Sequence, residues 1–160
     1  MSLWIVPIRM EPAEVQIDAP QPLVYARLTS FTAEGATEGS TVLGREASGV
    51  FVVEFRTTVR GLLGGEKTHR TVERVTLSEP EELRFLGLEG PLALLQDRIS
   101  LVEESGGTRL RYESTFGLKG SVLGWLLGVA HVKRVLARFM RAHLSQLKDS
   151  IEGGAGGEQP

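Results

Sequence analysis

The hydrophobic period changes near the end of the chain, and this change constrains the fold more than any other feature. From Val129 to Ile151 apolar residues follow helical spacing, with lysines and arginines between them. Before this helical stretch, residues 41–118 show mostly the alternation of strands, broken by turn-forming residues. A helix over Val132 to Ile151 would be about 30 Å long. Because its apolar stripe has only one large apolar surface to pack on, we expect a strand meander with a long C-terminal helix on its concave side.

Two shorter segments precede the strand region. The stretch "EVQID", Glu14 to Asp18, alternates as a half-buried strand does. "APQPLVYARLTSF" opens with prolines and predicts a short helix from Leu23 to Thr29. The stretch "TAEGATEGST" that follows has the composition of a loop.

The hairpin made by "LLQDRISLV" and "TRLRYESTF" has a register that can be derived. Closing the turn at Ser105–Gly106 places apolar residues opposite apolar residues. Closing the turn at Gly106–Gly107 instead moves each pair by two residues along one strand, so the same side chains stay on the same face. The predicted pairs are Leu101 with Leu110, Ile99 with Tyr112, and Asp97 with Ser114.

The hairpin around "GLLGGEK" leaves two registers open. A two-residue turn at Gly64–Gly65 puts Arg74 on the face of Phe55 and exposes Val75. A three-residue or bulged loop instead matches Phe55 with Val75. We prefer the second register because it buries Val75. The polar residues that it turns inward are His69, Thr71 and Glu73.

Composition excludes several classes of function. The chain has 160 residues, 41% of them hydrophobic and 24% charged, which is ordinary for a soluble globular protein. A net charge of −2 argues against a nucleic-acid-binding protein. The absence of cysteine excludes disulfides and thiolate chemistry. The three histidines show no zinc-site spacing, and no glycine string matches a phosphate-binding loop, so we expect neither metal nor cofactor.

The stretch "GSVLGWLLGVAHV", Gly120 to Val132, carries no charge and three regularly spaced glycines. It is too short to span a membrane, which takes about 20 apolar residues. Its glycines share one helical face, which suits an oligomer seam. We favour a helix start that packs closely on the sheet or borders a ligand entrance. Each glycine costs about 1 kcal/mol in a helix interior, so this turn is expected to be mobile or broken.

The first residues of the chain are not expected to act as a targeting signal. "MSLWIVPIRM" lacks the basic region and cleavage site of a signal peptide, so a cytoplasmic location is the expectation. We expect one domain over residues 1–152 and a disordered Gly-rich tail over residues 153–160.

Several strings resemble the START-like helix-grip superfamily, also called SRPBCC, in its polyketide cyclase/dehydrase-like branch. They are "VQIDAPQPLVYARLT", "ERVTLSEPEELRFLGLEGPL", "GGTRLRYESTFGLKG" and "VKRVLARFMRAHLSQLKDSIE", within Glu14 to Glu152. The resemblance implies an α+β fold in which a curved antiparallel sheet wraps around the long helix, with an elongated cavity between them. The usual second short helix is compressed into "SFTAEGATEGST", so one wall of that cavity is expected to differ.

The candidate site residues face this expected cavity. Asp97 with Tyr112 and Ser114 is the favoured polar cluster, because its register is the more secure one. Asp97 or Glu73 is a candidate general base, and Tyr112 or His69 a candidate acid. The ligand-binding candidates are Phe51, Val53, Phe55, Thr57, Leu62, Leu63, Val75, Phe85, Leu95, Asp97, Ile99, Tyr112, Ser114, Trp125, Val129, Val132, Leu136 and Met140.

Three functions remain open, and the residues favour the first. It is binding or transport of a small hydrophobic ligand, such as a lipid, an isoprenoid or a polyketide-like molecule. The second is a cyclase or dehydratase that uses an inward carboxylate as general base. The third is a protein-interaction module whose contact rim is Leu62–Leu63 and Gly90–Leu95. We expect a monomer or homodimer without nucleic-acid partners, whose membrane contact is at most transient.

Overall fold

The computed structural model describes residues 5–32, 39–60, 64–118 and 122–154. Its elements follow the expected order, with one additional strand at the N-terminus. They are β1 (Val6–Arg9), β2 (Ala13–Ile17), α1 (Gln21–Leu28), the 3₁₀ turn η1 (Ser30–Thr32), β3 (Ser40–Ala47), β4 (Val50–Arg60), β5 (Glu66–Ser78), β6 (Glu82–Glu89), β7 (Leu94–Glu104), β8 (Gly107–Leu118) and α2 (Val122–Gly154).

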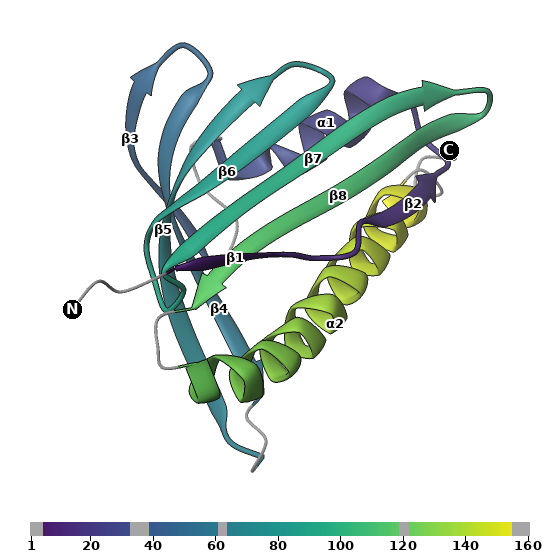
Figure 1. Ribbon diagram of the computed structural model, residues 1–160. Coiled ribbons are helices and arrows are strands. Elements are labelled where there is room, and N and C mark those ends of the chain that lie inside the picture. The colour runs from purple at the N-terminus through teal and green to yellow at the C-terminus, as the bar shows by residue number, and fades with distance from the viewer. Residues whose placement is uncertain (1–4, 33–38, 61–63, 119–121, 155–160) are drawn as a thin grey trace.

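The strands form one antiparallel sheet in the order β1-β8-β7-β6-β5-β4-β3, and β2 pairs with the other half of β8. Figure 1 shows this sheet strongly curved. Helix α2 runs diagonally from the lower end of β4 to β2, and α1 lies behind the upper parts of β6 and β7. The predicted architecture, a curved antiparallel sheet with a long C-terminal helix, is therefore confirmed.

The β7–β8 hairpin has the predicted register. Asp97 lies opposite Ser114, as expected, and the other two predicted pairs are also present. The turn uses Gly106 with a φ of 91°, a left-handed conformation that glycine adopts without strain. Because each strand alternates, this register fixes Tyr112 and Ser114 on the same face as Asp97.

The β4–β5 hairpin has the predicted faces but not the predicted pairs. Phe55 lies opposite Thr71 rather than Val75, and Val75 lies opposite Phe51. The described pairing ends at Arg60 with Glu66, a register that the expected three-residue loop does not give. The even shift leaves the side-chain parity intact, which is why Glu73 faces inward all the same.

Strand β1 was not predicted, because four residues containing a proline give a weak strand signal. Pro7 is tolerated since β1 lies at the edge of the sheet, where a missing N–H group costs little. Ile8 lies opposite Phe116 and belongs to the same hydrophobic cluster. Strand β1 therefore forms the edge of the sheet next to β8.

Helix α2 begins at Val122, within the expected helix start, and is continuous to Gly154, so that start is not broken. The cost of Gly124 and Gly128 is small against the helix-forming residues between them and the cooperativity of a long helix. Gly153 also belongs to the helix rather than to the expected tail, and residues 155–160 lie outside the described part of the chain.

The second half of α2 holds the helix against the sheet. Met140, Leu144 and Ile151 are each about 5% exposed and pack on residues of β2, β8 and α1. Polar contacts reinforce this packing at the helix end. Lys148 Nζ donates to a β2 carbonyl at 2.6 Å, and Glu152 Oε1 accepts from a backbone N–H at 2.9 Å. This half of the molecule is a conventional packed core.

The other half of the concave face packs without α2. Phe31 of η1 is 7% exposed and contacts the ring of Phe55 edge-on, with 5.6 Å between centroids. Val53 and Val75 are fully buried in the same cluster, which includes no described residue of α2. The concave face thus carries one apolar cluster that includes no described residue of α2 beside those that do, and Phe85 packs on both kinds.

Candidate functional site

Strand pairing places the candidate residues in one lateral row across the sheet. The row runs over five neighbouring strands and consists of Phe51, Val75, Phe85, Asp97 and Ser114. The next row contains Val53, Glu73 and Gly87. Glu73 and Asp97 are therefore one row apart on the same concave face, between β5 and β7.

Asp97 accepts two short hydrogen bonds from its neighbours on β8. Tyr112 Oη donates to Oδ2 at 2.6 Å, and Ser114 Oγ donates to Oδ1 at 2.5 Å. Burial raises the pKa of Asp97, and the two hydroxyl groups oppose that rise by stabilising the ionised form. Burial and the charge of Asp97 raise the pKa of Tyr112 well above its ordinary value, so this phenol is a neutral donor. The predicted polar cluster is thus formed.

Glu73 has a less saturated environment. The residue is 8% exposed, and Thr71 Oγ1 donates to its Oε1 at 3.0 Å. Burial, together with the charge of Asp97, raises the pKa of Glu73 to about 7, although the Thr71 hydrogen bond opposes this. Neither Glu73 nor Asp97 has an ion-pair partner among the described residues. At neutral pH this carboxyl is divided between its neutral and its charged form.

His69 does not join these groups. It lies opposite Thr57 on the far part of β5, four residues before Glu73 and therefore roughly 13 Å away along the strand. The candidate acid that lies beside a carboxylate is therefore Tyr112.

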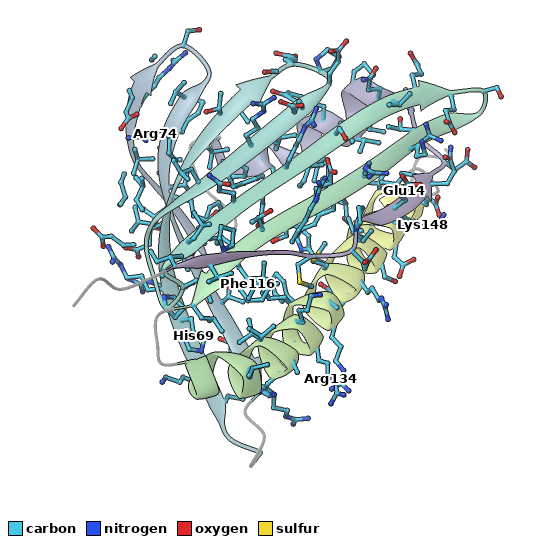
Figure 2. The ribbon with its side chains drawn as sticks, in the orientation of Figure 1. Glu14, His69, Arg74, Phe116, Arg134 and Lys148 are labelled. Carbon is cyan, nitrogen blue, oxygen red and sulfur yellow. The ribbon has the colours of Figure 1, made fainter. Side chains whose placement is uncertain are left out.

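The apolar candidates differ in exposure. Val53, Val75, Ile99 and Met140 are buried in the clusters already described. Half-buried candidates retain contact with water although they face the concave side or α2; they are Phe51, Phe55, Thr57, Phe85, Leu95, Val129, Val132 and Leu136. Leu62, Leu63 and the side chain of Trp125 lie outside the described part of the structure. Figure 2 shows Phe116, which is fully buried, between the sheet and α2.

One residue that packs on the aromatic side chains of the concave face was not predicted from the sequence. Phe31 lies between the predicted helix and the predicted loop, where no element was expected, yet it packs over Phe55 and Phe85. The available signal was a single aromatic residue in an otherwise small and polar stretch. The rim expected at Gly90–Leu95 is also different, because its apolar residues are half-buried and Leu92 packs in the cluster of Phe116.

Two hollows among the described residues lie away from the candidate residues. One is beside the β7–β8 turn, near Ala19 and Gly106. The other lies where β6 and β7 meet the start of α1, near Glu82 and Ser100. Neither includes a candidate residue, so the enclosed cavity between sheet and helix stays a prediction.

The outer face of the sheet has the opposite electrostatic character. Its carboxylates pair with arginines; for example, Glu54 accepts from Arg56 at 2.9 Å and from Arg70 at 2.6 Å. Glu82 pairs in the same way with Arg84 and Arg98. Among the described residues, no three histidine, aspartate or glutamate side chains are grouped so as to hold a metal ion. In that same part of the chain, no helix is long and apolar enough to cross a membrane.

A curved antiparallel sheet around a long C-terminal helix, with polar groups between the layers, defines the helix-grip class of the START-like superfamily. The family described as "Polyketide cyclase / dehydrase and lipid transport" matches residues 12–152, and the chain belongs to it. This confirms the resemblance found in the sequence.

Solved structures agree on the fold. The protein TTHA0849 from Thermus thermophilus is 21% identical with a TM-score of 0.74, over 92% of this chain and 99% of that one. The Zhui aromatase/cyclase from Streptomyces sp. R1128 is 18% identical with a TM-score of 0.75, over 92% and 94%. A START superfamily protein from Mycobacterium smegmatis is 12% identical with a TM-score of 0.69, over 91% and 99%. No curated protein matches this sequence significantly.

Proposed function

We propose that the protein binds a small, largely apolar molecule between the concave face and α2, with the polar end of that molecule at Asp97 and Glu73. The observation that carries the proposal is a pair of inward carboxylates, Glu73 buried and Asp97 half-buried, among the apolar residues of this face. Burying an ionisable group costs free energy unless it is fully paired. The hydroxyls of Thr71, Tyr112 and Ser114 meet only part of that need.

The surrounding side chains suit an apolar ligand. Phe51, Phe55 and Phe85 border the polar groups and are half-buried, which leaves part of each ring accessible. Burial of about 300 Å² of ligand hydrocarbon would contribute roughly 7 kcal/mol before ordering costs. The family description, which includes lipid transport, supports this reading.

The first experiment is native mass spectrometry of the protein purified from its own host, followed by displacement of the fluorescent probe N-phenyl-1-naphthylamine. We expect a hydrophobic molecule to co-purify, and Phe85→Ala to weaken probe binding several-fold. Leu88→Ala, a change on the exposed side of the same strand, is the matched control and should leave binding unchanged. A protein that binds neither a host molecule nor the probe would contradict the proposal.

A second function, that of a cyclase or dehydratase, is favoured by one specific observation. The pKa of Glu73, raised to about 7, suits a general base at neutral pH. Tyr112, held neutral beside Asp97, would serve as the acid. The similarity to an aromatase/cyclase is compatible with this chemistry.

Substitution of the carboxylates separates the two functions. Under the enzyme reading, Glu73→Gln or Asp97→Asn should lower turnover of a poly-β-ketone test substrate by at least about 100-fold, the usual contribution of a general base. Under the binding reading, no turnover is found with the unaltered protein, and probe affinity changes only modestly in either variant. Turnover that persists in both variants would exclude these carboxylates as bases.

A further inference from the structure

We propose that the polar end of the bound molecule is a cationic hydrogen-bond donor, a protonated amine, and that the site discriminates against carboxylate and phosphate ends. This inference rests on the proposed binding function and specifies its ligand. It follows from which atoms of the site remain free to contact a ligand.

The hydroxyl protons of the site are already used. Tyr112 and Ser114 both donate to Asp97, and Thr71 donates to Glu73. A hydroxyl group has a single proton to donate, so an incoming anion would meet lone pairs rather than donors. Apart from the proton that Glu73 carries in its neutral form, the polar groups of this cluster therefore offer acceptors to the ligand.

Glu73 supplies an independent observation that a donor is missing. Its Oε1 accepts from Thr71, whereas its Oε2 meets no donor among the described residues, although the residue is 8% exposed. Its neighbours across the sheet are Val53 and Gly87, which have no polar side chain. Leu95 fills the space beside Gly87, since its Cβ lies 3.0 Å from where a Gly87 Cβ would be. A buried acceptor of this kind is satisfied only by water or by a ligand.

No cation of the described chain replaces that ligand. Arg45 lies over the ring of Phe51 at 5.4 Å, on the edge strand β3, and is exposed. Lys67 shares the inward parity of β5 but is exposed and six residues from Glu73, roughly 20 Å along the strand. Two inward carboxylates without a counter-ion favour a positively charged partner.

The ionisation of the site agrees with this choice. Burial raises the pKa of both Glu73 and Asp97, so a bound cation would lower both values and release protons. The other titratable groups on this face are Tyr112 on β8 and, further along β5, His69. None of these groups is a fixed positive charge.

The test compares ligands that differ only at the polar end. Dodecylamine, dodecanol and dodecanoate compete with N-phenyl-1-naphthylamine at pH 8, where the amine is still protonated. We expect dodecylamine to bind at least about tenfold more tightly than dodecanoate, a difference of about 1.4 kcal/mol. We expect dodecanol to lie between the two.

Two glutamate variants assign the effect to the site. Glu73→Gln should remove most of the amine preference, whereas Glu54→Gln should retain it. Glu54 lies on the adjacent strand and has the same low exposure, but it faces outward. The two variants change the net charge equally, so general attraction of the amine to the protein is controlled.

The outcomes distinguish the two proposals. Dodecanoate or dodecanol binding as tightly as dodecylamine would overturn the amine proposal and leave the binding function intact. An amine preference that survives Glu73→Gln and Asp97→Asn would overturn it as well. If the probe and all three competitors fail to bind, the proposed function itself fails. Should a variant not fold, the ligand order of the unaltered protein still decides.

Discussion

Two carboxylates with similarly low exposure, one on each face of the sheet, have opposite electrostatic surroundings. Glu54 on β4 is 9% exposed and Glu73 on β5 is 8% exposed, and the two belong to adjacent strands. Glu54 faces outward and is covered by Arg56 and Arg70, whose hydrogen bonds lower its pKa. Glu73 faces inward, has only Thr71 as a donor, and has its pKa raised to about 7.

This difference indicates where the chain has kept an energetically costly feature. Outward carboxylates are neutralised by side chains that still reach water, so they need no further partner. Inward carboxylates are desolvated without a counter-ion, an arrangement that stability alone would remove. Ionisable groups with strongly shifted pKa values are typical of functional sites. The concave face is therefore where we place the function.

The largest expected effect tests whether the hydrophobic core lies on the concave face of the sheet. Phe116 is fully buried between sheet and α2, whereas Leu88 is 43% exposed on the outer side of β6. Phe116→Ala should lower the free energy of unfolding by about 4 kcal/mol, and Leu88→Ala by about 0.5 kcal/mol or less. Urea denaturation followed by circular dichroism measures both. Similar losses in the two variants would contradict the assignment of faces.

The second prediction concerns how much the buried carboxylate of Glu73 lowers the free energy of unfolding. Because the pKa of Glu73 is about 7 in the folded protein and about 4.5 ordinarily, the folded state binds more protons between these values. The free energy of unfolding therefore falls as the pH rises through this window, by about 3 kcal/mol in total. Glu73→Gln removes that loss. The variant should be more stable than the unaltered protein at pH 8 and should gain little at pH 5.

Glu54→Gln should show the opposite sign. The pKa of Glu54 is lowered, so its ion pairs contribute stability above its ordinary pKa and lose it as the pH falls. The variant should be less stable at neutral pH and should approach the unaltered protein in acid. Thermal unfolding between pH 4 and pH 8 gives both curves. A Glu73→Gln curve parallel to that of the unaltered protein would exclude a buried, titrating Glu73.

Much of the site was predictable because strand parity survives errors in loop length. The β7–β8 hairpin could be registered from its short turn, which brought Asp97 and Ser114 together correctly. The β4–β5 hairpin was shifted by four residues, yet Glu73 kept its face. An even shift changes the neighbours of a residue but not the side of the sheet on which it lies.

Features that depend on tertiary contacts were not predictable. Phe31 packs on the aromatic cluster from a position just before the predicted loop, where no element was expected. Strand β1 exists because β8 offers it an edge, which four residues containing a proline do not reveal. The hydrogen bond from Thr71 to Glu73, and the missing donor at the second oxygen, depend on side-chain positions that no periodicity encodes.

The smallest effect concerns the hydroxyl hydrogen bonds that stabilise ionised Asp97 on the concave face. Ser114→Ala removes one of the two hydroxyl donors to Asp97 and leaves Tyr112 in place. Since that hydrogen bond stabilises the ionised form, the pKa of Asp97 should rise further, and the free energy of unfolding should fall by about 1 kcal/mol. Carbon-13 NMR titration of the Asp97 carboxyl group measures the pKa directly. If that pKa stays unchanged while ligand preference is retained, the Ser114 hydroxyl does not stabilise the ionised carboxylate, and Tyr112 is the hydroxyl group that does.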